Sequence, residues 1–181
     1  QLTLEVPAGI IRIEYQKDTD GLIGCVRIFN VASYLAHEGL VIKCPELGEL
    51  IIDVAYGGNY YAIIEPQKNF AGLEQFSAAQ VLRYSPLVRE AINNVATCVH
   101  PEDPSVNGIS HVMWTGKPQK PESSGANAVF YGSGAIDRSP CGTGTSARMA
   151  QLHAKGLLQA GQEFIHESII GSQFIGRIES T

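Results

Sequence analysis

The sequence has 181 residues, of which 44% are hydrophobic, and a formal net charge of −5. This length and apolar content are enough for one domain, or a pair of half-domains, with a buried core. The acidic balance argues against nucleic acid as a partner, and no apolar stretch approaches the roughly 18 residues of a membrane-spanning helix. No signal peptide pattern is present, and neither the four cysteines nor the five histidines show metal-ligand spacing, so we expect a cytoplasmic protein with no metal site and no disulfide framework.

The first third of the chain is predicted to be rich in β-strands. Residues 2–7 and 10–15 alternate between apolar and polar side chains, which predicts a hairpin. Residues 21–29 continue the strand pattern after a polar turn. Residues 30–37 fit either a short helix or a strand, because their apolar residues have helical spacing while both neighbouring segments are strands.

The next segment is predicted to form further strands around a pair of glycines. Residues 41–44 and 49–56 form one strand pair, and the run resumes at residues 60–64. The interruption is Gly57-Gly58-Asn59. Paired glycines inside a β pattern indicate a bulge or a close backbone approach, and a plain hairpin turn explains them equally well.

The middle of the chain combines helical and extended patterns. Residues 76–95 carry apolar residues at helical spacing, which predicts one or two surface helices interrupted near Pro86. Residues 98–108 have the composition of a loop. Residues 109–114 and 126–131 are predicted strands.

A lone thiol lies in the segment Asp137–Ala147, with the sequence Asp-Arg-Ser-Pro-Cys-Gly-Thr-Gly-Thr-Ser-Ala. Pro140 fixes one backbone angle, and Gly142 and Gly144 let backbone N–H groups approach a ligand closely. A helix is predicted to begin directly after Cys141. Free N–H groups and the helix dipole favour anions there, so we expect a lowered thiol pKa and a place for a ligand carboxylate or phosphate.

That helix is predicted to run to about Leu158 and to end near Gly161, and residues 163–170 then return to a strand. Its apolar residues spread over more than one face. We therefore expect it to be buried within a curved sheet, in an α/β (α+β) fold made mainly of short antiparallel strands.

Two other interpretations of the thiol segment compete with a catalytic one. Free cysteine is among the most buried residue types, and a glycine-rich turn before a helix can be a simple connection. Residues 142–147 also match the G-x-G-x-x-A dinucleotide fingerprint. The polar residues that precede them, and the lack of a βαβ pattern, argue against a nucleotide site.

Segment 137–147, taken together with Asp53–Ile63, resembles the proline racemase and 4-hydroxyproline epimerase family, and the resemblance runs through most of the chain. It implies a diaminopimelate-epimerase-like fold, in which each of two halves curves its strands around a central helix. The substrate lies in the cleft between the halves, and no cofactor is used. The activity implied is inversion of the α-carbon of 4-hydroxyproline or proline.

The resemblance also implies a role for each residue of the thiol segment. Cys141 is implied to be one of two thiol bases that flank the substrate α-carbon. Asp137 is implied to hold the imino group, and the backbone amides of Gly142, Thr143 and Gly144 to bind the carboxylate. Inversion by proton transfer needs a base on one face and an acid on the other, so one cysteine supplies only half of the machinery.

The sequence departs from the family because the second thiol segment is missing. Cys25, Cys44 and Cys98 lack the glycines and the helix that follow the other family cysteine. We therefore expect residues 1–181 to be mostly one epimerase-type half-domain, a fragment that lacks the N-terminal half and the last strands. Alone it is predicted to be inactive, and the sequence is compatible with a homodimer.

The choice of substrate rests on the same resemblance. A cysteine at position 141 favours racemisation or epimerisation, because family dehydratases typically carry threonine there. We favour 4-hydroxyproline over proline, with proline racemase proper as the alternative. A second alternative is a non-catalytic module that binds a small carboxylate and in which Cys141 is structural.

Overall fold

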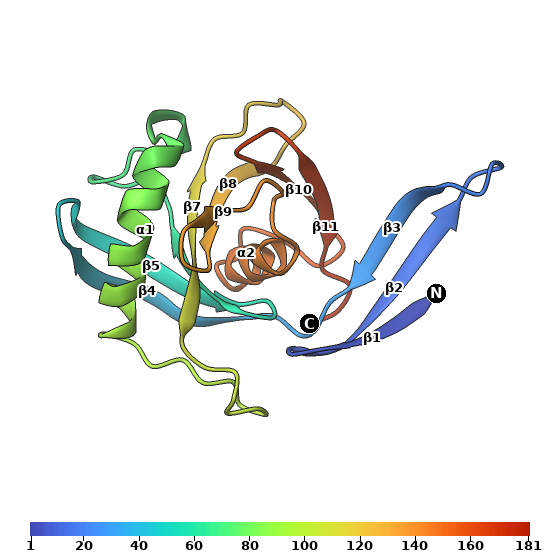
Figure 1. Cartoon of the computed structure of the whole chain (residues 1–181), viewed down its shortest axis with the longest axis horizontal. Helices are drawn as coiled ribbons and strands as arrows, with labels where there is room; N and C mark the ends of the chain where they lie inside the picture. The colour runs from blue at the N-terminus through green and yellow to red at the C-terminus, as the bar shows by residue number, and fades with distance from the viewer.

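The computed structural model describes residues 1–181 and divides their strands between two sheets (Figure 1). The smaller sheet contains β1 (Leu2–Val6), β2 (Gly9–Lys17) and β3 (Ile23–Phe29). The larger sheet contains β4 (Tyr34–Cys44), β5 (Gly48–Tyr56), β6 (Tyr60–Ile64), β7 (Ile109–Gly116), β8 (Gly125–Tyr131), β9 (Ala135–Ile136), β10 (Glu163–Ser168) and β11 (Gln173–Arg177). The helical segments are the short η1 (Leu73–Gln75), α1 (Ala78–Asn93) and α2 (Gly142–Ala154).

The larger sheet is mixed, with the order β11-β10-β8-β7-β6-β5-β4 and with β9 paired to β8. Most neighbours are antiparallel, as expected from the sequence, but β6 pairs parallel with β7 and β8 pairs parallel with β10. Each parallel pair is joined by a long connection that contains a helix, α1 in the first case and α2 in the second. The α/β prediction is thus confirmed, with a sheet that is not wholly antiparallel.

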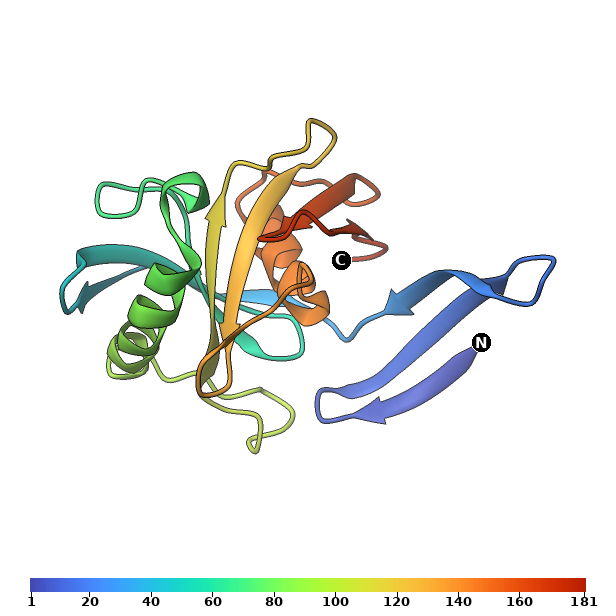
Figure 2. The same ribbon diagram turned by 45° about the horizontal axis from the view of Figure 1, so that its top comes forward.

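Helix α2 lies inside the curve of this sheet, as predicted (Figures 1 and 2). It contacts β4, β5 and β6 on one side and β11 at the opposite end of the strand order. Its residue Ala147 is fully buried against a small apolar cluster that the strands supply. The strand members of this cluster are Ala55, Tyr61, Ile63, Met113 and Val129.

Helix α1 covers the other face of the sheet and is a single helix, so the predicted interruption near Pro86 is wrong. Its buried residues Val81, Ser85, Val88 and Ile92 follow one stripe that continues past the proline. The stripe packs into the main core, where the Trp114 indole N–H donates to Ser85 Oγ over 2.8 Å. Tertiary burial along the whole stripe outweighs the local cost of the proline.

Helix α2 ends at Ala154, earlier than the predicted Leu158. Gly156 has φ +73°, and its N–H donates to the carbonyl of His153, while the Leu157 N–H donates to that of Leu152. This pair of hydrogen bonds is a Schellman motif, which needs a left-handed residue and is best served by glycine. Gly156 therefore ends the helix before Gly161 is reached.

Two other segments differ from expectation in smaller ways. Residues 30–37 contain no helix: Tyr34 already begins β4, and the residues before it are irregular. Strand β10 ends at Ser168, where the prediction extended it to residue 170. A turn closed by Gly171 N–H donating to the Ser168 carbonyl over 2.9 Å separates it from β11.

The smaller sheet extends away from the rest of the protein (Figures 1 and 2). Its register brings apolar side chains together on one face, and none of the buried residues of the chain precedes Ile42. The apolar face consists of Leu2, Leu4, Ile11, Ile13, Tyr15, Val26 and Ile28. Alternation of this kind is typical of a sheet that buries one face against another layer.

No helix in the structure is long and apolar enough to span a membrane.

Candidate functional site

The two sequence segments that carry the family resemblance meet at the first turn of α2. Gly57-Gly58-Asn59 forms the tight turn between β5 and β6, and Gly57 N–H donates to the Asn59 carbonyl over 3.1 Å. A Cβ on Gly57 would lie 2.2 Å from the Thr143 carbonyl oxygen and 2.5 Å from the Ala147 nitrogen. Both interpretations of the paired glycines are therefore correct, because this hairpin turn is also a close backbone approach.

Asn30 ties the site to the connection between the two sheets. Its Nδ2 donates to the Gly57 carbonyl over 2.8 Å and to Ser146 Oγ over 2.9 Å. Ser146 lies in the first turns of α2, so one side chain joins the end of the smaller sheet, the glycine turn and the helix. The sequence analysis did not single out Asn30, and only its place at the start of the ambiguous segment 30–37 could have drawn attention to it.

Cys141 is the N-cap residue of α2, as the sequence predicted. Its φ of +64° lies in the left-handed region that non-glycine residues rarely adopt, and it is 8% exposed. The backbone before it is held by a short polar chain: Cys141 N–H donates to Ser139 Oγ over 3.1 Å, and Ser139 Oγ donates to Asp137 Oδ1 over 2.9 Å. Such a conformation persists only where the surroundings determine it fully, and it fixes the direction of the thiol.

A buried polar group supports the same turn from behind. Asn127 Nδ2 on β8 donates to the Pro140 carbonyl over 2.8 Å, and Thr145 Oγ1 donates to the same oxygen over 3.3 Å. His166 on β10 lies behind both, with Nδ1 2.9 Å from Thr145 Oγ1 and 3.3 Å from Asn127 Nδ2. Burial lowers the pKa of His166 to about 3, so the ring is neutral and can accept a hydrogen bond at Nδ1.

The sulfur of Cys141 is surrounded by hydroxyl and amide groups. Tyr61 Oη on β6 is 3.2 Å from Sγ, and Thr143 Oγ1 is 4.0 Å from it. The two hydroxyls are only 2.5 Å apart. Gly144 also lies beside the thiol, and its N–H group acts to lower the pKa of Cys141.

The pKa of the Cys141 thiol is raised, so the predicted lowering is wrong for this chain. Burial is the largest cause, because a thiolate loses the stabilisation of water. The hydrogen bonds from Tyr61, Gly144 and Thr143 act in the opposite direction, while the Asp137 carboxylate raises the pKa further. The helix N-terminus was predicted correctly, but burial and the nearby carboxylate outweigh it.

The amides predicted to bind a carboxylate divide into two groups. The N–H groups of Gly142 and Thr143 form no hydrogen bond within the chain, as expected for the first turn of a helix. The Gly144 N–H differs from these two because it acts to lower the pKa of the Cys141 thiol. Two free amides at a helix N-terminus are a suitable place for an anion.

His111 on β7 and Tyr61 are further residues of this site that the sequence analysis missed. Their rings lie 4.8 Å apart, and burial is the main cause of a lowered pKa at His111. The Asp137 carboxylate acts in the opposite direction on that pKa. Tyr61 follows the glycine pair by three residues, a signal that could have indicated its place, whereas His111 in an apolar strand gave none.

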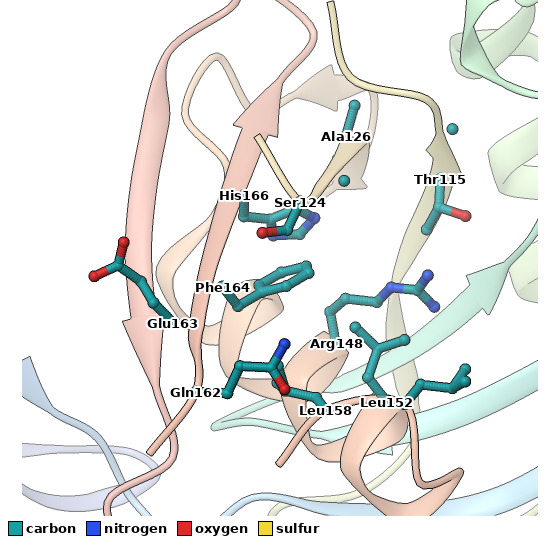
Figure 3. A pocket seen from close by; sticks show the side chains of 13 residues that line it. Thr115, Ser124, Ala126, Arg148, Leu152, Leu158, Gln162, Glu163, Phe164 and His166 are labelled. Carbon is teal, nitrogen blue, oxygen red and sulfur yellow. The ribbon is translucent and has the colours of Figure 1, made fainter. Parts of the chain in front are cut away.

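A cavity of about 240 Å³ lies at another place, between α2, β8 and β10 (Figure 3). Arg148, Phe164 and His166 are among the residues that line it, and Cys141 is not. Arg148 already pairs with Glu65, with 2.8 Å between Nη2 and Oε1. No group of three or more His, Cys, Asp or Glu side chains could hold a metal ion, and all four cysteines are free.

Comparison with known proteins identifies the family and the fold of this chain. The sequence profile of the family described as "Proline racemase" matches residues 1–181. The chain belongs to the proline racemase family. Among curated members, it is 61% identical over 180 residues to a "4-hydroxyproline 2-epimerase" from Shewanella loihica, a match that covers 99% of this chain and 54% of that protein. It is 55% identical over 179 residues to a "4-hydroxyproline epimerase" from Brucella suis, with 99% and 54% covered.

A solved structure of the proline racemase family has the same fold as this chain. The crystal structure of a hydroxyproline epimerase from Agrobacterium vitis, with bound trans-4-OH-L-proline, superposes with a TM-score of 0.85 at 32% identity. The match covers 96% of this chain and 49% of that one. The chain thus spans about half the length of the family members that it matches.

Proposed function

We propose that this chain is one half of a cofactor-independent 4-hydroxyproline 2-epimerase and that Cys141 is one of its two thiol acid/base groups. The observation that carries the proposal is the position of Cys141. Its thiol lies at the N-terminus of a buried helix, beside the free amides of Gly142 and Thr143. The names of the related proteins support 4-hydroxyproline as the substrate, with proline as the alternative.

In the proposed reaction, Cys141 exchanges a proton with the substrate α-carbon from one face. A second thiol, from a half of the enzyme outside these residues, acts on the other face: one removes the α-proton as thiolate, and the other delivers a proton as thiol. The substrate carboxylate binds the Gly142 and Thr143 amides, whose partial positive charge stabilises the carbanion. The Asp137 carboxylate, near Cys141, holds the protonated imino group.

The domain organisation follows from this reaction. Residues 1–181, as mostly one epimerase-type half-domain, supply one wall of a cleft, and residues outside the chain supply the other wall with the second thiol. The chain alone is therefore expected to be inactive. Its free cysteines support a reducing, cytoplasmic location.

One observation favours a different role, in which Cys141 is structural and the helix only binds a carboxylate. Burial raises the pKa of this thiol, which lowers its reactivity at neutral pH. The catalytic and the structural role of Cys141 are distinguished by the epimerase activity of a protein that contains both halves.

The test measures epimerisation of trans-4-hydroxy-L-proline and of L-proline by polarimetry. The full-length protein that carries this chain is compared with its Cys141→Ser variant and with Cys25→Ser, which removes an exposed thiol outside the site. We expect the parent and the Cys25→Ser variant to invert the α-carbon of 4-hydroxyproline. In Cys141→Ser we expect kcat to fall at least about a thousandfold, because a group that transfers the proton is lost. Full activity of Cys141→Ser would establish the structural role.

A further inference from the structure

Tyr61 connects the thiol of Cys141 to the hydroxyl of Thr143. Its side chain is fully buried, and Oη lies 3.2 Å from Sγ and 2.5 Å from Thr143 Oγ1. The sulfur and Thr143 Oγ1 are 4.0 Å apart, so the tyrosine hydroxyl is the closest link between them. No reaction step described above uses it.

The three groups can be hydrogen-bonded in two opposite directions. When Cys141 is a thiolate, Sγ only accepts, so the Tyr61 O–H donates to Sγ and the Thr143 O–H donates to Tyr61 Oη. When Cys141 is a thiol, S–H can donate to Tyr61 Oη, and the Tyr61 O–H then donates to Thr143 Oγ1. The proton that distinguishes thiol from thiolate is the one that sulfur exchanges with the substrate α-carbon. Apart from that S–H bond, the two arrangements differ only by rotations about C–O and C–S bonds, and both hydroxyls keep their own protons.

A two-thiol epimerase needs both protonation states of the same cysteine. Cys141 must be a thiolate when it removes the α-proton of one substrate epimer, and a thiol when it protonates the carbanion formed from the other epimer. A fixed donor stabilises the thiolate alone, as the Gly144 N–H does here. A hydroxyl both donates and accepts, so it can stabilise either state.

We propose that Tyr61 and Thr143 form a two-hydroxyl relay that reverses its hydrogen bonds as Cys141 passes between thiol and thiolate. This inference rests on the proposed function, because only a reversible acid/base group uses both arrangements. Tyr61 is thereby a residue of the reaction, since its hydroxyl contacts the reacting sulfur.

Other charged and titratable groups also face this part of the site. Asp137 lies on the loop before α2, and His111 on β7 packs against the Tyr61 ring, with Arg89 of α1 acting on His111 in turn. A Tyr61→Phe substitution leaves all three in place and keeps the aromatic ring within its apolar cluster. The change therefore removes the hydroxyl alone.

The strand offers a matched control in Tyr60. It is 2% exposed, and its hydroxyl is 2.7 Å from that of Tyr34, away from Cys141. Tyr60→Phe thus removes a buried, hydrogen-bonded hydroxyl from the adjacent residue. A purely structural effect of losing such a group is expected in both variants.

The experiment measures alkylation of Cys141 by iodoacetamide from about pH 6 to about pH 10 in the full-length protein, with mass spectrometry of the Cys141 peptide. In Tyr61→Phe we expect the apparent pKa of Cys141 to rise by about 1 unit and alkylation at pH 7 to slow about three- to tenfold, because a donor to the thiolate is lost. Tyr60→Phe should keep the parent profile. Thr143→Val should raise the pKa by a smaller amount, and Thr143→Ser should restore it.

Each outcome decides between the relay and its absence. An unchanged profile in Tyr61→Phe overturns the relay, and so does an equal shift in Tyr60→Phe. If Tyr61→Phe does not fold, as judged by circular dichroism, the Thr143 pair decides, and equal profiles of its valine and serine variants overturn the relay. If the pKa shifts as expected but the parent protein epimerises neither substrate, the proposed function fails while the two-hydroxyl geometry stands.

Discussion

Lys155, the residue that follows α2, forms an ion pair with Asp53 of β5 over 2.7 Å between Nζ and Oδ2. The Asp53 side chain is 5% exposed and also accepts from the Gln151 amide and from the Gly39 N–H. The C-terminal end of α2 is thereby fixed to the sheet, at the opposite end of the helix from Cys141. The stability of the protein and the position of Cys141 therefore depend on contacts at both ends of this helix.

Replacing Asp53 should destabilise the protein strongly. Asp53→Asn leaves the Lys155 ammonium without its nearest carboxylate, and we expect the free energy of unfolding to fall by about 3 kcal/mol. Urea denaturation measures this change. Glu179→Gln is the control, because it removes an exposed pair with Arg177 and should cost less than about 1 kcal/mol. Similar losses in both variants would contradict a special role of the buried pair.

The acid sensitivity of the protein should depend on His166. Its pKa of about 3 in the folded state lies below the unfolded value of about 6.5, so the unfolded chain binds the additional proton between these values. The contribution to stability is therefore complete above about pH 6.5 and is lost as the pH falls towards 3, with a slope of up to about 1.4 kcal/mol per pH unit. Urea denaturation between about pH 6.5 and about pH 4.5 should show this slope in the parent and a flatter line in His166→Gln. The same slope in both proteins would assign the acid sensitivity to another group.

Asp53 should add a second, lower acid transition. Burial raises its pKa, but the hydrogen bonds of Lys155, Gln151 and Gly39 and the Lys155 charge outweigh burial and leave the pKa below its usual value. Its contribution is present above the unfolded pKa of about 3.9 and is lost as the pH falls through the lower folded value. Below about pH 4, Asp53→Asn should therefore lose less further stability than the parent. A parallel decline of both proteins in this range would show that Asp53 is not responsible.

Gly57 should not tolerate even one additional carbon atom. A Cβ there would lie within 2.5 Å of two backbone atoms of α2, so Gly57→Ala must displace the turn or the helix. We expect a loss of at least about 3 kcal/mol in urea denaturation, with a matching loss of epimerase activity in the full-length protein. Gly134→Ala is the control, because a Cβ at that position has no neighbour within 4 Å, and its stability should change by less than about 0.5 kcal/mol.

The sequence predicts those parts of the fold that local patterns encode. Apolar patterns placed the strands of the smaller sheet and β5 to β8 and β10 of the larger one, and Pro140, Cys141 and the following glycines placed the start of α2. What could not be predicted depends on distant contacts. The parallel pairings follow from how the chain packs around two helices, and α1 continues through Pro86 because its whole stripe is buried.

The candidate site shows the same division between local and distant causes. The position of Cys141 at a helix N-terminus was predicted from its own segment. The direction of its pKa shift was not, because burial depends on strands that lie far away in sequence. Tyr61 approaches the thiol from 80 residues away, and no spacing rule reveals such a contact.

Removal of residues 1–29 should leave the larger sheet intact. None of the buried residues lies in this segment, so we expect the thermal midpoint to change by no more than a few degrees. Binding of a fluorescent hydrophobic dye should fall, because the apolar face of β1–β3 is removed. A collapse of the thermal transition would show that the smaller sheet supports the rest.

The apolar face of β1–β3 has a consequence for any measurement on residues 1–181 alone. Two copies of the chain that pack these faces together bury the exposed apolar side chains in a dimer. Because only the folded form associates in this way, a higher protein concentration raises the apparent free energy of unfolding. The thermal unfolding midpoint of the chain should then increase with protein concentration. Stability values for this chain are therefore comparable only at one fixed concentration.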